Sequence, residues 1–200
     1  MLGGAGLVEE LREACPGVEV QGPEDWGREF AFGQLRPAEH LDAGVQAVVI
    51  GFDARFCYYK LAIAAMHLRY TPRCRFVATN RDFSYPDAHC FVPGGGSLVE
   101  ALAAGSGRQP DVVAGKPSLD LLALVDGGRL DRARACMVGD RLDTDILFGN
   151  AGGLRATLLV LTGVSSLEEA ERAGAGGLRP TCALPSFGDL GELLERLGPD

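Results

Sequence analysis

The sequence predicts an α/β fold with a mostly parallel sheet. Short apolar runs alternate along the chain with amphipathic helical segments, and this alternation is typical of layered α/β proteins. Several of the apolar runs end in a glycine that is followed by a polar or charged residue, as expected where strands carry a functional site at their carboxyl ends. The length of 200 residues fits one or two domains.

The first part of the chain, residues 1–110, is predicted to form a βαβαβ unit. Residues 47–52 form a buried strand because their apolar run is continuous. Residues 58–70 form a helix because Leu61 and Ala65 recur at helical spacing. The remaining expected elements are a helix at 7–14, a strand at 18–20, an irregular segment at 24–43, a strand at 75–79 and a helix from Gly94 to about Ala104.

The second part, residues 111–200, repeats the alternation of strands and helices. Ser166 and Glu169 have the spacing of a capping box, which places a helix start at Ser166. The expected strands are 111–114, 135–138, 155–161 and 181–184, and the expected helices are 119–125, 143–149, 166–173 and 189–197.

Composition excludes several classes of partner. The formal net charge is −8 and no basic run is present, which argues against nucleic acid and anionic membranes. No apolar run approaches the ~20 residues of a membrane span, and the start lacks a signal-peptide pattern. The six cysteines are scattered without a Cys-x-x-Cys pair, so we expect reduced thiols and a cytoplasmic protein.

Three carboxylates follow an apolar strand in the segment Met137-Val-Gly-Asp-Arg-Leu-Asp-Thr-Asp-Ile146. Carboxylates at the carboxyl end of a parallel strand can hold Mg²⁺, which prefers oxygen ligands and keeps several waters. Asp140 is the candidate metal ligand, and Asp145 is a candidate for orienting the site. The alternative is a solvated turn, and Asp143 is expected to serve only as a cap of the following helix.

A second charged strand end occurs in Val112-Val-Ala-Gly-Lys-Pro-Ser118. Pro117 ends the strand and fixes the turn, so Lys116 is expected to project from the end of the sheet. An ammonium group there can bind a phosphate. Lys116 alone could equally be a surface lysine, but its position on a strand end shortly before Asp140 makes the pair more specific.

These two segments resemble the third and fourth motifs of the haloacid dehalogenase phosphatases. Four companion segments match as well, and the resemblance extends over about residues 2–194. They are Val48-Val-Ile-Gly-Phe-Asp53, Thr79-Asn80-x-Asp82, Gly107-Arg-Gln109 and Leu161-Thr-Gly-Val-Ser165. The segments are similar to the phosphoglycolate (glycerol-3-phosphate) phosphatase and pyridoxal phosphate phosphatase branch.

The resemblance implies an α/β cap domain at 1–110 and the C-terminal half of a Rossmann-like phosphatase core at 111–200. In this family an aspartate nucleophile forms an aspartyl-phosphate with the help of Mg²⁺. Residue by residue, Lys116 matches the motif lysine that contacts the phosphate, Asp140 the Mg²⁺ ligand and Asp145 its supporting carboxylate. The loop with Asn80, Asp82 and Tyr85 matches the part of the cap that contacts the substrate.

The family nucleophile motif, Asp-x-Asp-Gly, does not occur in this sequence. The expected full-length activity is hydrolysis of a small phosphomonoester such as 2-phosphoglycolate or glycerol 3-phosphate, with pyridoxal 5'-phosphate as the alternative substrate. Homodimerisation through the cap is also implied by the family. The chain as printed is expected to lack phosphatase activity, because it resembles a truncated family member. The competing hypothesis is a non-catalytic remnant that only dimerises or binds a partner.

Overall fold

The structure is a computed structural model that describes residues 1–25, 27–33, 36–174 and 176–197. The chain divides into two compact units, residues 1–115 and 116–200. The division falls five residues after the boundary expected from the sequence, at Gly115 instead of Pro110. The fold class is the predicted α/β type, and its sheets are mostly parallel.

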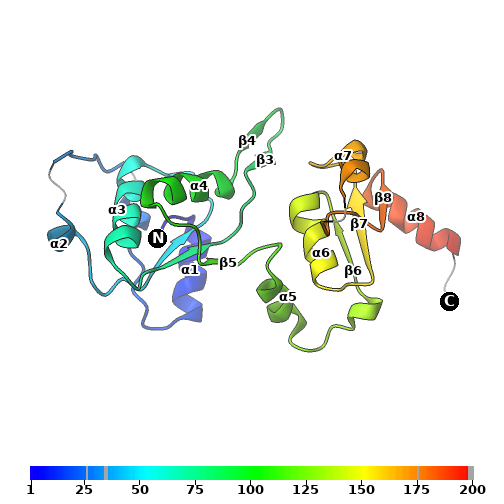
Figure 1. Cartoon of the computed structure of the whole chain (residues 1–200), viewed down its shortest axis with the longest axis horizontal. Coiled ribbons are helices and arrows are strands. Elements are labelled where there is room, and N and C mark those ends of the chain that lie inside the picture. Colours follow the sequence, from blue (N-terminus) through cyan, green and yellow to red (C-terminus); the bar gives the residue numbers. More distant parts are fainter. Residues whose placement is uncertain (26, 34–35, 175, 198–200) are drawn as a thin grey trace. The chain divides into compact units, whose positions relative to one another are not determined.

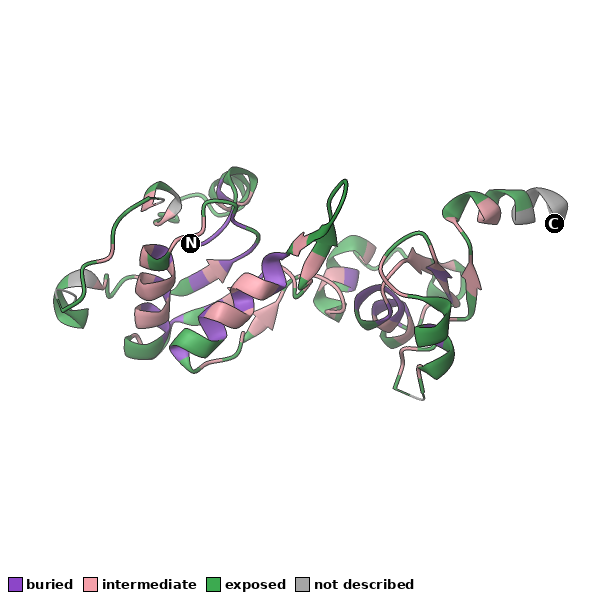
Figure 2. Ribbon diagram, turned by 90° about the horizontal axis from the view of Figure 1, so that it is seen from above, coloured by how far each residue is buried: buried purple, intermediate pink, exposed green. Residues whose placement is uncertain are grey.

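A three-stranded parallel sheet forms the centre of the first unit (Figure 1). The strands are hydrogen-bonded in the order β1-β2-β5, and helices α3 and α4 pack against one another and against β1. The elements are β1 (Ala47–Ile50), α3 (Tyr58–Tyr70), β2 (Arg75–Ala78), α4 (Gly95–Ser106) and β5 (Val112–Val113). The core contains Ile50, Phe76 and Leu102, and Figure 2 shows buried residues in purple along these helices and the sheet.

The rest of the first unit surrounds this core with short elements. An antiparallel hairpin of β3 and β4, which the sequence analysis did not predict, precedes α4. The additional elements are α1 (Ala5–Ala14), a 3₁₀ turn (Pro23–Asp25), α2 (Pro37–His40), β3 (Ser84–Pro86) and β4 (Phe91–Pro93).

A second parallel sheet, in the order β6-β7-β8, forms the centre of the second unit. Leu142, Ile146, Leu159 and Ala170 make a small core beside it. The elements are α5 (Leu119–Asp126), a 3₁₀ turn (Arg132–Arg134), β6 (Cys136–Gly139), a π-helical turn (Leu142–Ile146), α6 (Leu147–Ala151), β7 (Ala156–Val160), α7 (Leu167–Arg172), β8 (Cys182–Leu184) and α8 (Phe187–Leu197).

The predicted capping box is present at the start of α7. The Ser166 side chain accepts from the backbone N–H of Glu169, and the Glu169 carboxylate accepts from the backbone N–H of Ser166 at 2.7 Å. These hydrogen bonds hold the pKa of Glu169 below its usual value. The two residues therefore fix where the helix begins, as their spacing predicted.

The structure corrects the prediction of where β5 belongs. Instead of opening the second unit, β5 pairs with β2 of the first unit. The carboxylate of Asp111 explains this pairing, because it accepts from the backbone N–H of Phe76 at 2.7 Å and from the Arg108 guanidinium at 3.0 Å. The hydrogen bond from Phe76 is the main cause that lowers the pKa of Asp111.

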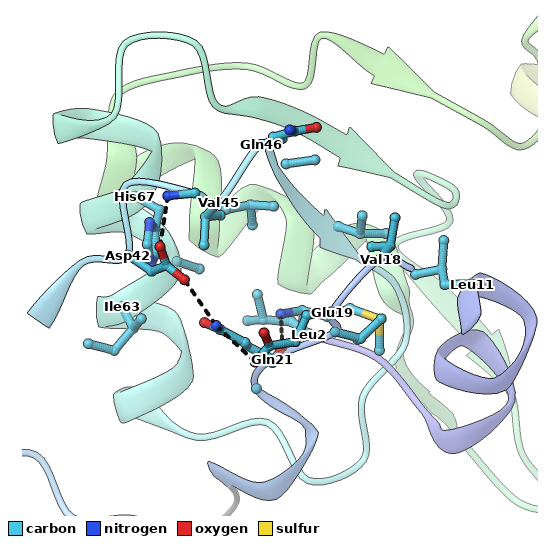
Figure 3. Close-up of a pocket in the computed structure, with 18 of the residues that line it drawn as sticks. Leu2, Leu11, Val18, Glu19, Gln21, Asp42, Val45, Gln46, Ile63 and His67 are labelled. Carbon is cyan, nitrogen blue, oxygen red and sulfur yellow. Dashed lines mark hydrogen bonds between the residues drawn. The ribbon is translucent and has the colours of Figure 1, made fainter. Parts of the chain in front are cut away.

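Two further local predictions were wrong. The segment 18–20 forms no strand and instead lines a cavity together with residues of β1 (Figure 3). Asp143 caps no helix: it lies inside the π-helical turn with its side chain 63% exposed, and the N-cap residue of that turn is Arg141.

Candidate functional site

The loop that follows β6 is organised by Asp145. This residue is only 3% exposed, and its Oδ2 accepts from the backbone N–H groups of Asp140 at 3.0 Å and Arg141 at 3.1 Å. A Cβ at Gly139 would overlap the Asp145 carboxylate, so this close approach requires glycine there. The predicted carboxylate therefore folds back over the end of β6 and fixes the backbone of the candidate metal ligand.

Lys116 contacts the same buried carboxylate. Its Nζ donates to Asp145 Oδ1 at 2.6 Å, and the lysine side chain is 42% exposed while the Asp145 side chain is 4% exposed. A buried carboxylate is costly unless it is paired and hydrogen-bonded. The ammonium group and the two backbone donors meet this requirement, and they leave Lys116 partly accessible to solvent.

Asp140 is held from the opposite side by the loop that follows β7. The backbone N–H of Val164 donates to Asp140 Oδ2 at 3.0 Å, and that of Ser165 donates to the Asp140 carbonyl at 2.9 Å. A Cβ at Gly163 would overlap the Asp140 carboxylate. No role was expected for Gly163 from the sequence, although it lies in Leu161-Thr-Gly-Val-Ser165, one of the segments that carry the resemblance.

The residues around Asp140 fit a Mg²⁺ site that a single carboxylate completes together with water and phosphate. Within the described part of the chain, Asp140 Oδ1 accepts no hydrogen bond, whereas both oxygens of Asp145 are already occupied by donors. The described residues contain no group of three or more His, Cys, Asp or Glu side chains placed to hold a metal. Mg²⁺ commonly uses only one or two carboxylates and keeps several waters, so this donor set is compatible with it.

The remaining predicted site residues lie in the first unit, at the base of the β3–β4 hairpin. Asn80 Oδ1 accepts from the backbone N–H of Asp82 at 3.1 Å. The Tyr85 ring makes an edge-to-face contact with Phe52, with ring centroids 5.5 Å apart. Asn80 and Asp82 thus lie in the loop before β3 and Tyr85 lies in β3 itself, while Lys116, Asp140 and Asp145 form the group in the second unit.

Among the helices of the described residues, none has both the length and the apolar composition of a membrane span.

Comparison with known proteins gives the family. The HAD-hydrolase-like family model matches residues 113–190, which include Lys116, Asp140 and Asp145. The chloroplastic phosphoglycolate phosphatase 1A of Arabidopsis thaliana is 44% identical over 177 residues, which are 86% of this chain and 47% of the relative.

Two further comparisons concern a second relative and a solved structure. Chronophin of Mus musculus is 43% identical over 200 residues, 98% of this chain and 62% of the relative, so the chain spans roughly half to two thirds of these relatives. The crystal structure of a glycerol phosphate phosphatase from Mycobacterium tuberculosis in complex with magnesium has a TM-score of 0.61 and 39% identity, covering 72% of this chain and 42% of that one. The chain belongs to the haloacid dehalogenase superfamily.

Proposed function

We propose that this chain carries the metal- and phosphate-binding part of a Mg²⁺-dependent phosphatase for small phosphomonoesters. The observation that carries the proposal is the linked arrangement in which Lys116 and the backbone of Asp140 both bind the buried Asp145 carboxylate. The Asp145 carboxylate thus holds the Lys116 ammonium group close to Asp140, whose Oδ1 accepts no hydrogen bond from the described residues. A phosphate dianion needs this combination, since it must be bound by positive charge on more than one side.

Each residue has a distinct role in the proposed site. Asp140 would hold Mg²⁺ through Oδ1, and the bound ion would neutralise charge on the phosphate oxygens. Lys116 would donate to a phosphate oxygen from Nζ, which is partly exposed. Asp145 positions both groups and does not itself contact the substrate, because its oxygens are occupied by protein donors.

The substrate class is proposed from the relatives and from the loop of the first unit. Phosphoglycolate phosphatase and glycerol phosphate phosphatase are named among the similar proteins, as is chronophin, a pyridoxal phosphate phosphatase. We favour phosphoglycolate or glycerol 3-phosphate because Thr79-Asn80 matches that form of the loop more closely. Homodimerisation through the first unit and a cytoplasmic location stay predictions.

Covalent catalysis in this family requires an aspartate nucleophile, and the 200 residues contain no Asp-x-Asp-Gly. We therefore expect the 200-residue polypeptide to bind Mg²⁺ and phosphate without turning over phosphomonoesters. Loss of a covalent nucleophile commonly removes several orders of magnitude of rate.

The test is a titration of the full chain with MgCl₂ and then with inorganic phosphate, followed by NMR of the backbone amides. The amide chemical shifts that change should centre on Asp140 and the loop after β7. The variant Asp140→Asn should weaken Mg²⁺ binding about tenfold or more. The matched control is Asp143→Asn in the same loop. Equal weakening by both variants would contradict the assignment of Asp140. Hydrolysis of p-nitrophenyl phosphate that disappears in Asp140→Asn would show that the chain contains a nucleophile of its own.

A further inference from the structure

Ser165 makes two hydrogen bonds with the segment that follows β6. It belongs to the loop between β7 and α7, and both of these elements are labelled in Figure 1. Its backbone N–H donates to the Asp140 carbonyl at 2.9 Å, and its side-chain Oγ accepts from the backbone N–H of Leu142 at 3.2 Å. Ser165 therefore binds the two peptide groups that flank Arg141.

The side-chain hydrogen bond satisfies a donor at the start of the π-helical turn. The first N–H groups of a helical segment have no partner within that segment. The N-cap residue of this turn, Arg141, provides no side-chain hydrogen bond, so the acceptor for Leu142 comes from Ser165, 23 residues further along the chain. Leu142 is only 8% exposed, and a buried N–H without a partner is costly. The serine hydroxyl is therefore the cap of this turn.

The same short stretch of the loop also binds Asp140. Besides the bond from Ser165 to the Asp140 carbonyl, the backbone N–H of Val164 donates to Asp140 Oδ2 at 3.0 Å. Both bonds come from consecutive residues, so a shift of this stretch away from Leu142 would move both donors together. The orientation of Oδ1, the oxygen proposed to bind Mg²⁺, depends on these two donors and on the bond from the Asp140 N–H to Asp145.

The neighbouring residue Ser166 has a different partner. Its Oγ accepts from the backbone N–H of Glu169 at 3.2 Å, as part of the capping box at the start of α7. The hydroxyl of Ser165 thus holds the loop to the segment after β6, whereas that of Ser166 stabilises α7. Two adjacent serines with the same side chain therefore provide a matched pair for separating an effect on Asp140 from an effect on the stability of the loop.

We propose that the Ser165 hydroxyl is a positioning group for the metal ligand Asp140. By binding Leu142, it keeps the N–H groups of Val164 and Ser165 against Asp140, and this fixes the orientation of Oδ1. The inference rests on the proposed function, because it requires that Asp140 binds Mg²⁺. Residues that orient a metal ligand without touching the metal commonly change the affinity by about 10- to 100-fold.

The test measures Mg²⁺ affinity of the full chain by isothermal titration calorimetry with MgCl₂, and hydrogen exchange of the Leu142 amide by NMR. The variant Ser165→Ala should weaken Mg²⁺ binding by about tenfold and accelerate exchange at Leu142. The conservative variant Ser165→Thr keeps the hydroxyl and should retain both properties of the wild type. The matched control Ser166→Ala removes a helix cap, so it should lower the urea midpoint of unfolding and leave the Mg²⁺ affinity unchanged.

The variant Asp140→Asn is measured alongside, so that failure of this inference can be distinguished from failure of the proposed function. Wild-type Mg²⁺ affinity in Ser165→Ala, with weakened binding in Asp140→Asn, would overturn the inference alone. Equal losses of affinity in Ser165→Ala and Ser166→Ala would also overturn it, because the loop would then act only through its stability. So would a Ser165→Thr variant that binds as weakly as Ser165→Ala.

Unchanged Mg²⁺ binding in Asp140→Asn would overturn the proposed metal site and this inference with it. If Ser165→Ala does not fold, Ser165→Cys takes its place, since a thiol is a weaker hydrogen-bond acceptor than a hydroxyl. This variant should weaken Mg²⁺ binding and accelerate exchange at Leu142 in the same direction as Ser165→Ala. Wild-type values of both properties in Ser165→Cys would contradict the role of the hydroxyl.

Discussion

Lys116 and Asp145 form an ion pair in which Nζ lies 2.6 Å from Oδ1, and the carboxylate is almost completely buried while the lysine is not. The same carboxylate accepts two backbone N–H groups through its other oxygen. The cation, the carboxylate and the loop that follows β6 therefore form one connected unit. A change at Asp145 should affect both the loop and Lys116.

The variant Asp145→Asn should destabilise the second unit. The amide retains one oxygen for the backbone donors but loses the charge that pairs with Lys116, and hydrogen bonds to charged groups contribute about 1.5–3 kcal/mol. We expect a loss of about 1–3 kcal/mol in the free energy of unfolding, measured by urea denaturation. The control Asp143→Asn removes an exposed charge of the same loop and should stay within about 0.5 kcal/mol of the wild type. Equal losses in the two variants would mean that the Asp145 contacts stabilise the second unit no more than the exposed Asp143 side chain does.

The variant Gly163→Ala should displace the Asp140 carboxylate. The new Cβ would overlap that carboxylate, so either the loop after β7 or the Asp140 side chain must move. We expect Mg²⁺ affinity to fall by about tenfold or more, as changes in residues that orient metal ligands commonly do. Isothermal titration calorimetry with MgCl₂ measures the change. The matched control is Gly174→Ala, whose Cβ meets no atom within 4 Å, and its affinity should equal that of the wild type.

The variant Asp111→Asn should loosen β5 from β2. Asp111 accepts from the Phe76 backbone and from Arg108, and about a third of its side chain is exposed, 34%, which reduces the expected effect through solvent screening. We expect a loss of about 1 kcal/mol in the free energy of unfolding. Hydrogen exchange at Ala114, whose N–H donates to the Ala78 carbonyl at 2.8 Å, should accelerate as well. An unchanged rate there would show that backbone pairing alone holds β5.

Acidification should destabilise the first unit through His67. Burial, the largest cause, lowers the pKa of this histidine, and the Met1 ammonium lowers it further while Asp42 opposes the shift. The unfolded chain therefore binds a proton at a pH where the folded chain does not. The contribution of neutral His67 to stability is complete above the unfolded pKa of about 6.5 and is lost as pH falls through the folded pKa.

The measurement is the free energy of unfolding of wild type and His67→Gln at a series of pH values. Wild type should lose more stability than the variant as pH falls below about 6.5. Parallel curves would show that His67 does not contribute to the pH dependence.

The sequence predicted the strand end of the second unit better than the connections around it. The expected apolar strand is present as β6, and Asp145 accepts from the backbone of Asp140 just beyond it, while the metal role of Asp140 stays a prediction. The predicted role of Asp143 was wrong because the sequence rules for the start of an α-helix do not anticipate a π-helical turn. That turn places Asp145, not Asp143, next to the backbone N–H groups of Asp140 and Arg141, which donate to its Oδ2.

Other features could not be predicted because they depend on contacts between distant residues. The two-residue strand β5 belongs to the first sheet through the Asp111 carboxylate and its bond to Phe76, a partner 35 residues away. The β3–β4 hairpin is short and contains Pro86 and Pro93, so no alternation of apolar residues marked it. The segment 18–20 has the composition of a strand, but it takes part in none of the strand pairings among the described residues.

The π-helical turn at Leu142–Ile146 makes the length of this loop a fixed quantity. Removing one residue between Arg141 and Asp145 would allow an ordinary α-helical turn and would rotate every later side chain by about 100°. The Asp145 carboxylate would then point away from Lys116, even though every residue type needed for the site would still be present. A point substitution in this loop therefore removes single contacts, whereas an insertion or deletion separates Asp145 from Lys116 and removes the whole arrangement at once.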